Sequence, residues 1–351
     1  MEAIENVFNG TARFGSRVTC QISRNGDLIH RVYLVTTLPE LVTGSTKEWV
    51  DYVGLRLIKA VEIEIGGQKI DKHYADWMYV WNELSLPAGK RDGYKLMVGG
   101  DLPSSASATV PATKLYIPLE FWFCRNVGLA LPLIALQYHE VKINIDFETL
   151  ANCTKAGTIS SELVDASLWV DYIYLDTDER RRFAQLSHEY LIEQLQFTGD
   201  EVVNGTTARL KLNFNHPVKE LVWVTPVDAV GGAANNWTNY LTSAAANPMD
   251  KCNIQLNGQD RFAVREANYF TLVQPFQHHE NIPAGKGINV YSFALKPEEH
   301  QPSGTLNFSR IDTAYLNMTM GSSAASKCKV FAVNYNVLRI MSGMGGLSFS
   351  N

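Results

Sequence analysis

The chain has few cysteines, and their arrangement suits neither disulfides nor zinc. The 351 residues contain five, widely spaced and without a C-x-x-C motif: Cys20, Cys124, Cys153, Cys252 and Cys328. An odd number with wide gaps argues against a disulfide framework, and the missing C-x-x-C pairs argue more strongly against a structural zinc site. We therefore expect the protein to be made in a reducing compartment and not exported.

Long apolar runs and an excess of basic charge are also missing. The uncharged stretch Val127–His139 is interrupted by Gly128 and Pro132, whereas a membrane helix needs about 20 apolar residues. Met1–Gly10 carries acids and no apolar segment, so we expect no signal peptide. The 31 Lys and Arg and 36 Asp and Glu give a net charge of −5, so there is no global basic field to hold DNA.

Familiar catalytic and cofactor motifs are absent as well. There is no G-x-S-x-G, H-E-x-x-H or Walker sequence, and the glycine cluster at 343–346 has no helix after it. The segments 278–280 (HHE) and 298–300 (EEH) look like metal ligands, but adjacent histidines on a strand point in opposite directions. We expect no catalytic, cofactor or metal site.

What the chain does contain is a series of alternating apolar segments. Val141–Phe147 (VKINIDF) alternates strictly between apolar and polar residues. Similar patterns occur at Leu55–Ile65, Leu168–Leu175, Leu210–Phe214, Glu220–Val224, Ile288–Leu295 and Lys329–Ile340. A period of two with one apolar face is typical of half-buried antiparallel strands, so the fold class is predicted to be all-β.

Helical patterns are limited to two short segments. Asp76–Leu84 places Trp77, Val80, Trp81 and Leu84 on one stripe. The second segment, 176–189, has N-cap candidates and acids in its first turn, and it lies near the middle of the chain. We expect this second helix to connect two domains through Asp176, Glu179, Arg180, Arg181, Arg182 and Phe183, with Phe183 as its apolar anchor.

The three arginines in this helix allow two interpretations. A patch for phosphate or nucleic acid is one, but three arginines without interleaved aromatic residues are a weak indication of it. Arginines on a capped helix more often pair with acids or face solvent. We favour salt bridges between domains or subunits, and we expect no specific binding of nucleic acid.

An internal repeat of long period is the most informative feature of the sequence. Residues 63–68 (IEIGGQ) match residues 254–259 (IQLNGQ), and both contain a dipeptide suited to a tight hairpin turn. Residues 58–61 resemble 218–221, and residues 170–173 resemble 333–336. The offsets are 160, 191 and 163 positions, which we interpret as a duplication with an extra loop in the second half.

Thr225–Asp250 is the segment that would supply this extra loop. It is rich in small residues, yet it contains Trp237 and Tyr240, which a fully solvated loop would rarely keep. We expect these two aromatic residues to contact a neighbouring subunit; a self-contained surface decoration is the alternative. Asn236 begins an N-x-T sequon in this loop, and it is a weak candidate for glycosylation.

Two similar halves of mostly antiparallel strands predict two tandem eight-stranded antiparallel jelly rolls with a few short helices. We expect residues 1–184 to form the N-terminal roll with the connector helix, and residues 185–351 to form the C-terminal roll.

Several segments, in order along the chain, also carry a family resemblance. They are 117–126 (IPLEFWFCRN), 129–141 (LALPLIALQYHEV), 174–184 (YLDTDERRRFA), 188–194 (HEYLIEQ), 275–279 (PFQHH), 291–295 (YSFAL), 302–304 (PSG) and 307–312 (NFSRID). This set resembles the major capsid proteins of the nucleocytoplasmic large DNA viruses. The chain is short for that family, so we expect trimmed surface loops.

The resemblance implies a non-enzymatic structural protein with a double jelly roll. It implies homotrimers that form pseudo-hexagonal capsomers and tile an icosahedral virion capsid, assembled in the host cytoplasm. The implied partners are further copies of the chain, neighbouring capsomers, and minor capsid and penton proteins. A carbohydrate-binding or carbohydrate-cleaving β-sandwich is the alternative, because a pair of carboxylates can serve as a glycosidase site.

Overall fold

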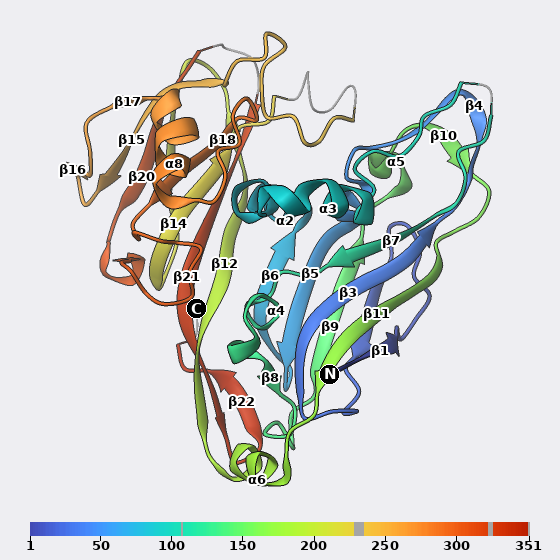
Figure 1. Ribbon diagram of the computed structural model, residues 1–351. Helices are drawn as coiled ribbons and strands as arrows, with labels where there is room; N and C mark the ends of the chain where they lie inside the picture. The colour runs from blue at the N-terminus through green and yellow to red at the C-terminus, as the bar shows by residue number, and fades with distance from the viewer. Residues whose placement is uncertain (107, 228–234, 322–325, 350–351) are drawn as a thin grey trace. The chain divides into compact units, whose positions relative to one another are not determined.

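The computed structural model describes residues 1–106, 108–227, 235–321 and 326–349 (Figure 1). It is mostly β-sheet, with 46% of residues in strands and 18% in helices. The chain divides into two compact units. Unit 1 comprises Met1–Met78, Asp92–Gln194 and Asn336–Ser350, and most of unit 2 is formed by Tyr79–Arg91 and Leu195–Tyr335.

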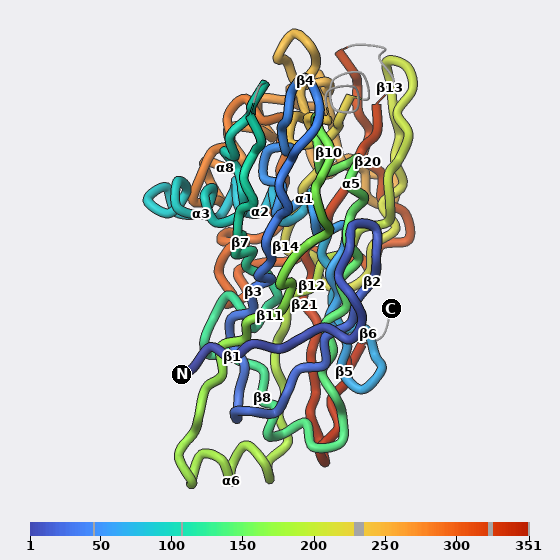
Figure 2. Tube along the Cα trace, turned by 90° about the vertical axis from the view of Figure 1, so that its right-hand side faces the viewer, coloured from blue at the N-terminus to red at the C-terminus, as the bar shows by residue number. Residues whose placement is uncertain are grey.

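Eight strands of unit 1 form two sheets that share a core. They are β1 (Glu2–Val7), β2 (Arg17–Gln21), β3 (Leu28–Leu38), β5 (Ile58–Ile65), β6 (Gln68–Tyr74), β7 (Thr113–Pro118), β9 (Val141–Phe147) and β11 (Val164–Ile173). One sheet has the order β1-β11-β3-β7, and the other has the order β2-β9-β5-β6. Figure 2 shows β3 and β11 running beside each other, as their antiparallel pairing requires.

Eight strands of the second roll repeat this arrangement. They are β12 (His188–Val203), β13 (Thr207–Lys211), β14 (Pro217–Val224), β15 (Met249–Leu256), β16 (Gln259–Asp260), β18 (Ile288–Ser292), β20 (Ala314–Met320) and β21 (Ser326–Met341). Their sheets have the orders β12-β21-β14-β18 and β13-β20-β15-β16. In both rolls the first strand pairs with the eighth and the second pairs with the seventh, which is jelly-roll connectivity. The predicted double jelly roll is confirmed.

Shorter elements decorate the two rolls. The helices are α1 (Val53–Leu57), α2 (Ala75–Ser85), η1 (Ala88–Lys90), α3 (Arg91–Met97), α4 (Trp122–Arg125), η2 (Val127–Leu129), α5 (Leu150–Cys153), α6 (Thr177–Gln185), η3 (Tyr269–Val273), α8 (Gln274–His278) and η4 (Phe308–Arg310). The strands are β4 (Leu41–Trp49), β8 (Leu131–Pro132), β10 (Thr154–Ile159), β17 (Arg265–Glu266), β19 (Leu306–Asn307) and β22 (Met344–Leu347). No helix in the described part of the chain is long and apolar enough to cross a membrane.

The alternating segments of the sequence correspond to strands, with shifted boundaries. Val141–Phe147 is the whole of β9. The predicted strand at 55–65 instead begins with helix α1 and becomes β5 only from Ile58. Helix α2 was expected to bury one stripe, but Met78 and Tyr79 between the stripe residues are buried too. This helix is therefore enclosed on more sides than its amphipathic pattern indicates.

The predicted repeat is confirmed for the two hairpins at 63–68 and 254–259. The match of residues 58–61 with 218–221 is wrong. Gly66 and Gly67 join β5 to β6, and Asn257 and Gly258 join β15 to β16; all four have positive φ, as a type I′ turn requires. Residues 170–173 and 333–336 lie on β11 and β21, which occupy the same place in their sheets. Residues 58–61 and 218–221 lie on β5 and β14, which occupy different places.

Because residues 58–61 and 218–221 lie on strands that do not correspond, the second-half loop has to be interpreted differently. By strand order β14 corresponds to β3, so the segment between β14 and β15 corresponds to residues 39–57 between β3 and β5. In unit 1 that segment carries β4 and α1. The expectation that the loop lacks a counterpart in the first half is therefore wrong, because the two similar segments 58–61 (IKAV) and 218–221 (VKEL) lie on strands that do not correspond.

Candidate functional site

The connector helix α6 begins with the N-cap and the acidic first turn that its sequence predicts. The backbone N–H of its N-cap, Asp176, donates a hydrogen bond to Glu179 Oε2 at 3.3 Å, which completes a capping box. Asp178 and Glu179 place negative charge at the N-terminal end of the helix dipole. The helix ends at Gln185, and β12 begins at His188, so it is shorter than the expected 176–189.

A buried carboxylate holds the start of this helix. Asp27 is almost fully buried just before β3, and its Oδ1 accepts a hydrogen bond from Arg180 Nε at 3.0 Å. Its Oδ2 accepts a second hydrogen bond from the backbone N–H of Leu175 at 2.8 Å. Arg180 is thus paired within unit 1, whereas Arg181 and Arg182 are exposed. Arg180 pairs with an acid of its own unit, and the expected salt bridges between domains or subunits stay a prediction.

Phe183 was expected to be a buried anchor, but its side chain is only half buried. Its ring stacks on His188, with centroids 5.1 Å apart and planes 21° apart. His188 Nε2 also lies 2.8 Å from the Phe183 carbonyl oxygen. No residue of α6 is fully buried. Phe183 therefore packs the end of the helix against the start of β12 and not against a core.

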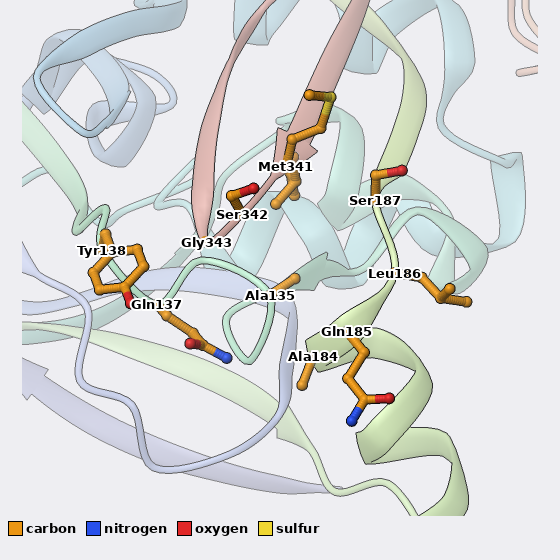
Figure 3. A pocket seen from close by; sticks show the side chains of 11 residues that line it. Ala135, Gln137, Tyr138, Ala184, Gln185, Leu186, Ser187, Met341, Ser342 and Gly343 are labelled. Carbon is orange, nitrogen blue, oxygen red and sulfur yellow. The ribbon is translucent and has the colours of Figure 1, made fainter.

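An open pocket of about 510 Å³ lies beside the end of α6 (Figure 3). It is lined by Ala135, Gln137, Tyr138, Ala184, Gln185, Leu186, Ser187, Ile340, Met341, Ser342 and Gly343. The backbone N–H of Tyr138 donates to the carbonyl oxygen of Gly343 at 2.9 Å, which joins two of the lining segments. Tyr138 and Leu186 are exposed at its rim. The lining described for this pocket contains no acid, lysine, arginine or histidine side chain.

The aromatic residues of the second-half loop are buried inside unit 2. Trp237 and Tyr240 lie with ring centroids 5.6 and 6.3 Å from Tyr79 of α2. Gly287 has φ +74° and would place a Cβ against the Tyr240 backbone, so the loop fits closely there. This burial by itself explains why the loop keeps two large aromatic residues. Residues 228–234 of the loop lie outside the described residues, and its contact with a neighbouring subunit stays a prediction.

Asn236, the sequon residue, is partly exposed. Its Oδ1 accepts a hydrogen bond from Thr238 Oγ1 at 3.4 Å, so the side chains of the sequon already contact each other. Glycosylation at this position stays a prediction.

A buried charged cluster occurs in unit 2 where the sequence suggested metal ligands. His279 Nε2 lies 2.8 Å from Glu220 Oε2, and His279 Nδ1 lies 2.8 Å from Glu298 Oε1. Burial alone lowers the pKa of His279, but the two carboxylates outweigh it and raise the pKa from 6.5 to about 9. His279 is therefore an imidazolium held between two acids.

The other members of the suspected metal cluster point elsewhere. His278 Nδ1 lies 2.9 Å from the Leu295 carbonyl oxygen, and the Glu299 carbonyl accepts a hydrogen bond from buried Lys219. Among the described residues, no three histidine, cysteine or carboxylate side chains converge in a way that could hold a metal ion. Glu220 was missed by the sequence analysis; the available indication was an acid within an otherwise apolar strand.

All five cysteines are free thiols, and four of them are buried. Burial raises the pKa of Cys20 to about 11 and that of Cys153 to about 12. These thiols stay protonated at neutral pH, so they serve as small apolar core residues rather than as nucleophiles.

Comparison with known families shows to which protein family this chain belongs. A model described as "Large eukaryotic DNA virus major capsid protein" matches residues 179–346, and one described as "Major capsid protein N-terminus" matches residues 1–176. The chain belongs to the major capsid protein family of large eukaryotic DNA viruses. The two matches meet at α6, which the sequence analysis took as the connector.

Individual relatives agree with this family. The chain is 56% identical to the major capsid protein of Pyramimonas orientalis virus, in an alignment covering all of this chain and 90% of the relative. It is 41% identical to that of Paramecium bursaria Chlorella virus 1, covering all of this chain and 91% of the relative. The alignment with the Phaeocystis pouchetii virus protein extends over 483 positions, so that relative has insertions where this chain is shorter.

Solved capsid structures share the fold. PBCV-1 VP54, fitted into a reconstruction of the virophage Sputnik, superposes with a TM-score of 0.87 at 38% identity, covering all of this chain and 96% of VP54. The Faustovirus major capsid protein gives a TM-score of 0.81 at 14% identity, covering 97% of this chain and 90% of that one, and it supports the fold alone. This member of the major capsid protein family is therefore a structural protein.

Proposed function

We propose that this capsid protein forms homotrimeric, pseudo-hexagonal capsomers that tile an icosahedral shell. The observation that carries the proposal is the repeated eight-strand order, β1-β11-β3-β7 with β2-β9-β5-β6 and its counterpart in the second roll. Three chains with two similar rolls each supply six similar blocks around a threefold axis. Closed rings built from repeated heterologous contacts are a common form of symmetric assembly.

Two further observations support a purely structural role without enzymatic activity. One cluster of acids and a histidine, formed by Glu220, His279 and Glu298, has a histidine with no exposed side-chain surface. The relatives at 56% and 41% identity are named major capsid proteins, and a neighbour with a TM-score of 0.86 is titled as a virus capsid model.

The proposed partners follow from the same role. They are further copies of the chain, neighbouring capsomers, and minor capsid and penton proteins, with assembly in the host cytoplasm. The net charge of −5 supports a shell that encloses its genome without binding it specifically. In this proposal residues 1–184 and 185–351 supply the two rolls, and α6 connects them.

The mass and shape of the purified protein test the proposal. Size-exclusion chromatography with light scattering should give about three times 39.2 kDa, and negative-stain images should show hexagon-like particles with threefold symmetry. A stable monomer that binds or cleaves glycans would contradict the proposal and favour the carbohydrate-active alternative.

A further inference from the structure

An exposed tyrosine of unit 1 is supported from one side by a glycine. Tyr138 is 76% exposed, and its backbone N–H donates to the Gly343 carbonyl oxygen at 2.9 Å. Gly343 has φ +78°, and a Cβ at this position would lie 2.6 Å from Tyr138 Cδ2. The ring therefore lies directly against the Gly343 backbone, while most of its surface stays open to a ligand.

Two pockets meet at this tyrosine. The pocket of about 510 Å³ beside α6 and a second pocket of about 600 Å³ both have Gln137 and Tyr138 in their lining. All residues that line the two pockets belong to unit 1. A ligand that lies over the Tyr138 ring can therefore extend into both pockets.

The polar side chains of the first pocket are uncharged amides and hydroxyls. Figure 3 shows Gln137, from the loop that carries Tyr138, and Gln185, from the end of α6, on two sides of the pocket. Ser187 and Ser342 add two hydroxyls to the lining. In the described part of the chain, the side chains of these two glutamines and two serines have no hydrogen-bond partner. Their donors and acceptors are therefore available to a ligand.

The second pocket adds neutral groups from the N-terminal strands, and its charged side chains are held by contacts within the protein. Asn9, Gln21 and Ser23 supply two amides and a hydroxyl.

The charged members of that lining have partners of their own. Arg24 Nη2 donates to two backbone carbonyl oxygens, those of residues 136 and 139. Glu140 Oε2 lies 3.4 Å from Lys142 Nζ, and His139 Nδ1 lies 3.1 Å from the backbone nitrogen of Gly345. The groups left open in both pockets are thus mostly neutral.

A neutral oligosaccharide matches this combination of groups. Its hydroxyls both donate and accept hydrogen bonds, as amides and hydroxyls do, and the apolar C–H face of a pyranose ring packs against an aromatic ring. A phosphate or carboxylate would meet no cation in the lining of the first pocket, because the exposed Arg181 and Arg182 of α6 are not part of it. An apolar peptide would cover the amides and hydroxyls without pairing them, which costs free energy.

We propose that Tyr138 and the two pockets beside it bind a neutral oligosaccharide. One pyranose unit stacks on the Tyr138 ring. The units on either side form hydrogen bonds with Gln137 and Gln185 in the first pocket and with the amides of the second. This binding goes beyond the proposed role in the shell, and it does not require the trimer, since one copy of unit 1 supplies the whole site.

Saturation-transfer NMR on the full-length protein tests the site with cellotriose, mannotriose and galactotriose as neutral probes. We expect at least one of them to bind with millimolar affinity and to receive saturation mainly at the C–H protons of one sugar unit, the one over the ring. If none of the three receives saturation at about 10 mM, the proposal is overturned. The mass of the protein is measured on the same sample, so a failure of the trimer proposal is seen separately from a failure of this one.

Variants at the tyrosine show whether the sugar binds at this site. Tyr138→Ser removes the ring and should weaken binding about tenfold, whereas Tyr138→Phe keeps the ring and should bind within about twofold of wild type. Tyr174 is 49% exposed in unit 1 and lies outside both linings, so Tyr174→Ser is the matched control and should bind as wild type does. Unchanged binding by Tyr138→Ser would show that the sugar binds elsewhere and would overturn the assignment.

The amides are tested by a double variant. Gln137→Ala with Gln185→Ala should weaken binding about fivefold or more, because the sugar loses hydrogen bonds on two sides of the first pocket. Both side chains are exposed, so the circular dichroism spectrum and the thermal midpoint should not change. If this variant binds the probes as wild type does while Tyr138→Ser does not, the sugar lies on the ring alone, and the assignment of the first pocket is wrong.

Discussion

His279 Nε2 and Glu220 Oε2 lie 2.8 Å apart, and neither side chain has any exposed surface. The pair joins the segment after α8 to the centre of β14, and Glu298 contacts the other ring nitrogen. A buried ion pair is strongly destabilised when one partner is removed, because the remaining charge stays buried without compensation. This pair therefore makes the stability of unit 2 depend on the protonation of one histidine.

The first prediction concerns the pH dependence of that stability. The folded pKa of His279, about 9, lies above its ordinary value of 6.5, so its contribution is complete below pH 6.5 and is lost as the pH rises through about 9. The difference corresponds to roughly 3 kcal/mol. Denaturant unfolding of wild type and His279→Gln should therefore differ most at pH 6, and the difference should shrink by about that amount at pH 10.

Other groups also titrate above pH 9, so the decisive quantity is the difference between the two proteins and not the wild-type curve. His278→Gln is the matched control, because His278 contacts only a carbonyl oxygen among the contacts described for its ring. A difference between wild type and His279→Gln that is equal at pH 6 and pH 10 would show that the histidine is not charged in the folded protein.

The second prediction compares the two partners of an ion pair with unequal burial. Asp27 is buried and accepts two hydrogen bonds, whereas the Arg180 side chain is 58% exposed. Asp27→Asn should lower the free energy of unfolding by about 1.5–3 kcal/mol, since it weakens two charge-assisted bonds at a buried site. Arg180→Ala should cost less than Asp27→Asn, since Asp27 keeps its hydrogen bond from the backbone N–H of Leu175. Arg181→Ala is the control, and equal losses for Asp27→Asn and Arg180→Ala would contradict this account.

The third prediction concerns two adjacent turn glycines. Both have positive φ, but a Cβ on Gly66 would collide with the His139 ring, whereas one on Gly67 would meet no atom within 4 Å. Gly67→Ala should cost about 1 kcal/mol from backbone strain. Gly66→Ala should cost about 1–3 kcal/mol more from overpacking, visible as a lower thermal midpoint. Equal costs for the two variants would mean that the His139 ring moves aside freely, and would contradict this account.

The fourth prediction concerns the second-half loop. Tyr240 is fully buried beside Tyr79, so Tyr240→Ala should lower the free energy of unfolding by about 3–5 kcal/mol through the cavity that it leaves. Ser243→Ala, at an exposed position of the same loop, should change it little. If Tyr240→Ala instead keeps its stability and loses only the oligomer, the residue acts at a subunit contact, as the sequence analysis expected.

Local signals in the sequence determined much of the secondary structure. The alternation in Val141–Phe147, the capping pair of Asp176 and Glu179, and the Asn257-Gly258 turn each act over a few residues. Such signals need no knowledge of the rest of the chain. The family resemblance, spread over segments of both halves, then supplied the role of the protein, which periodicity alone had not reached.

Tertiary structure decided what depends on residues far apart in the chain. The repeat was misaligned at 58–61 because β5 and β14 have similar apolar patterns, and only their different sheet neighbours distinguish them. Glu220 and His279 could not be paired from sequence, since a strand does not reveal which distant segment covers it. Trp169 is as apolar as its buried neighbours Leu168 and Val170, yet it is 37% exposed. Its exposure depends on what packs on each side of the sheet, which the local sequence does not show.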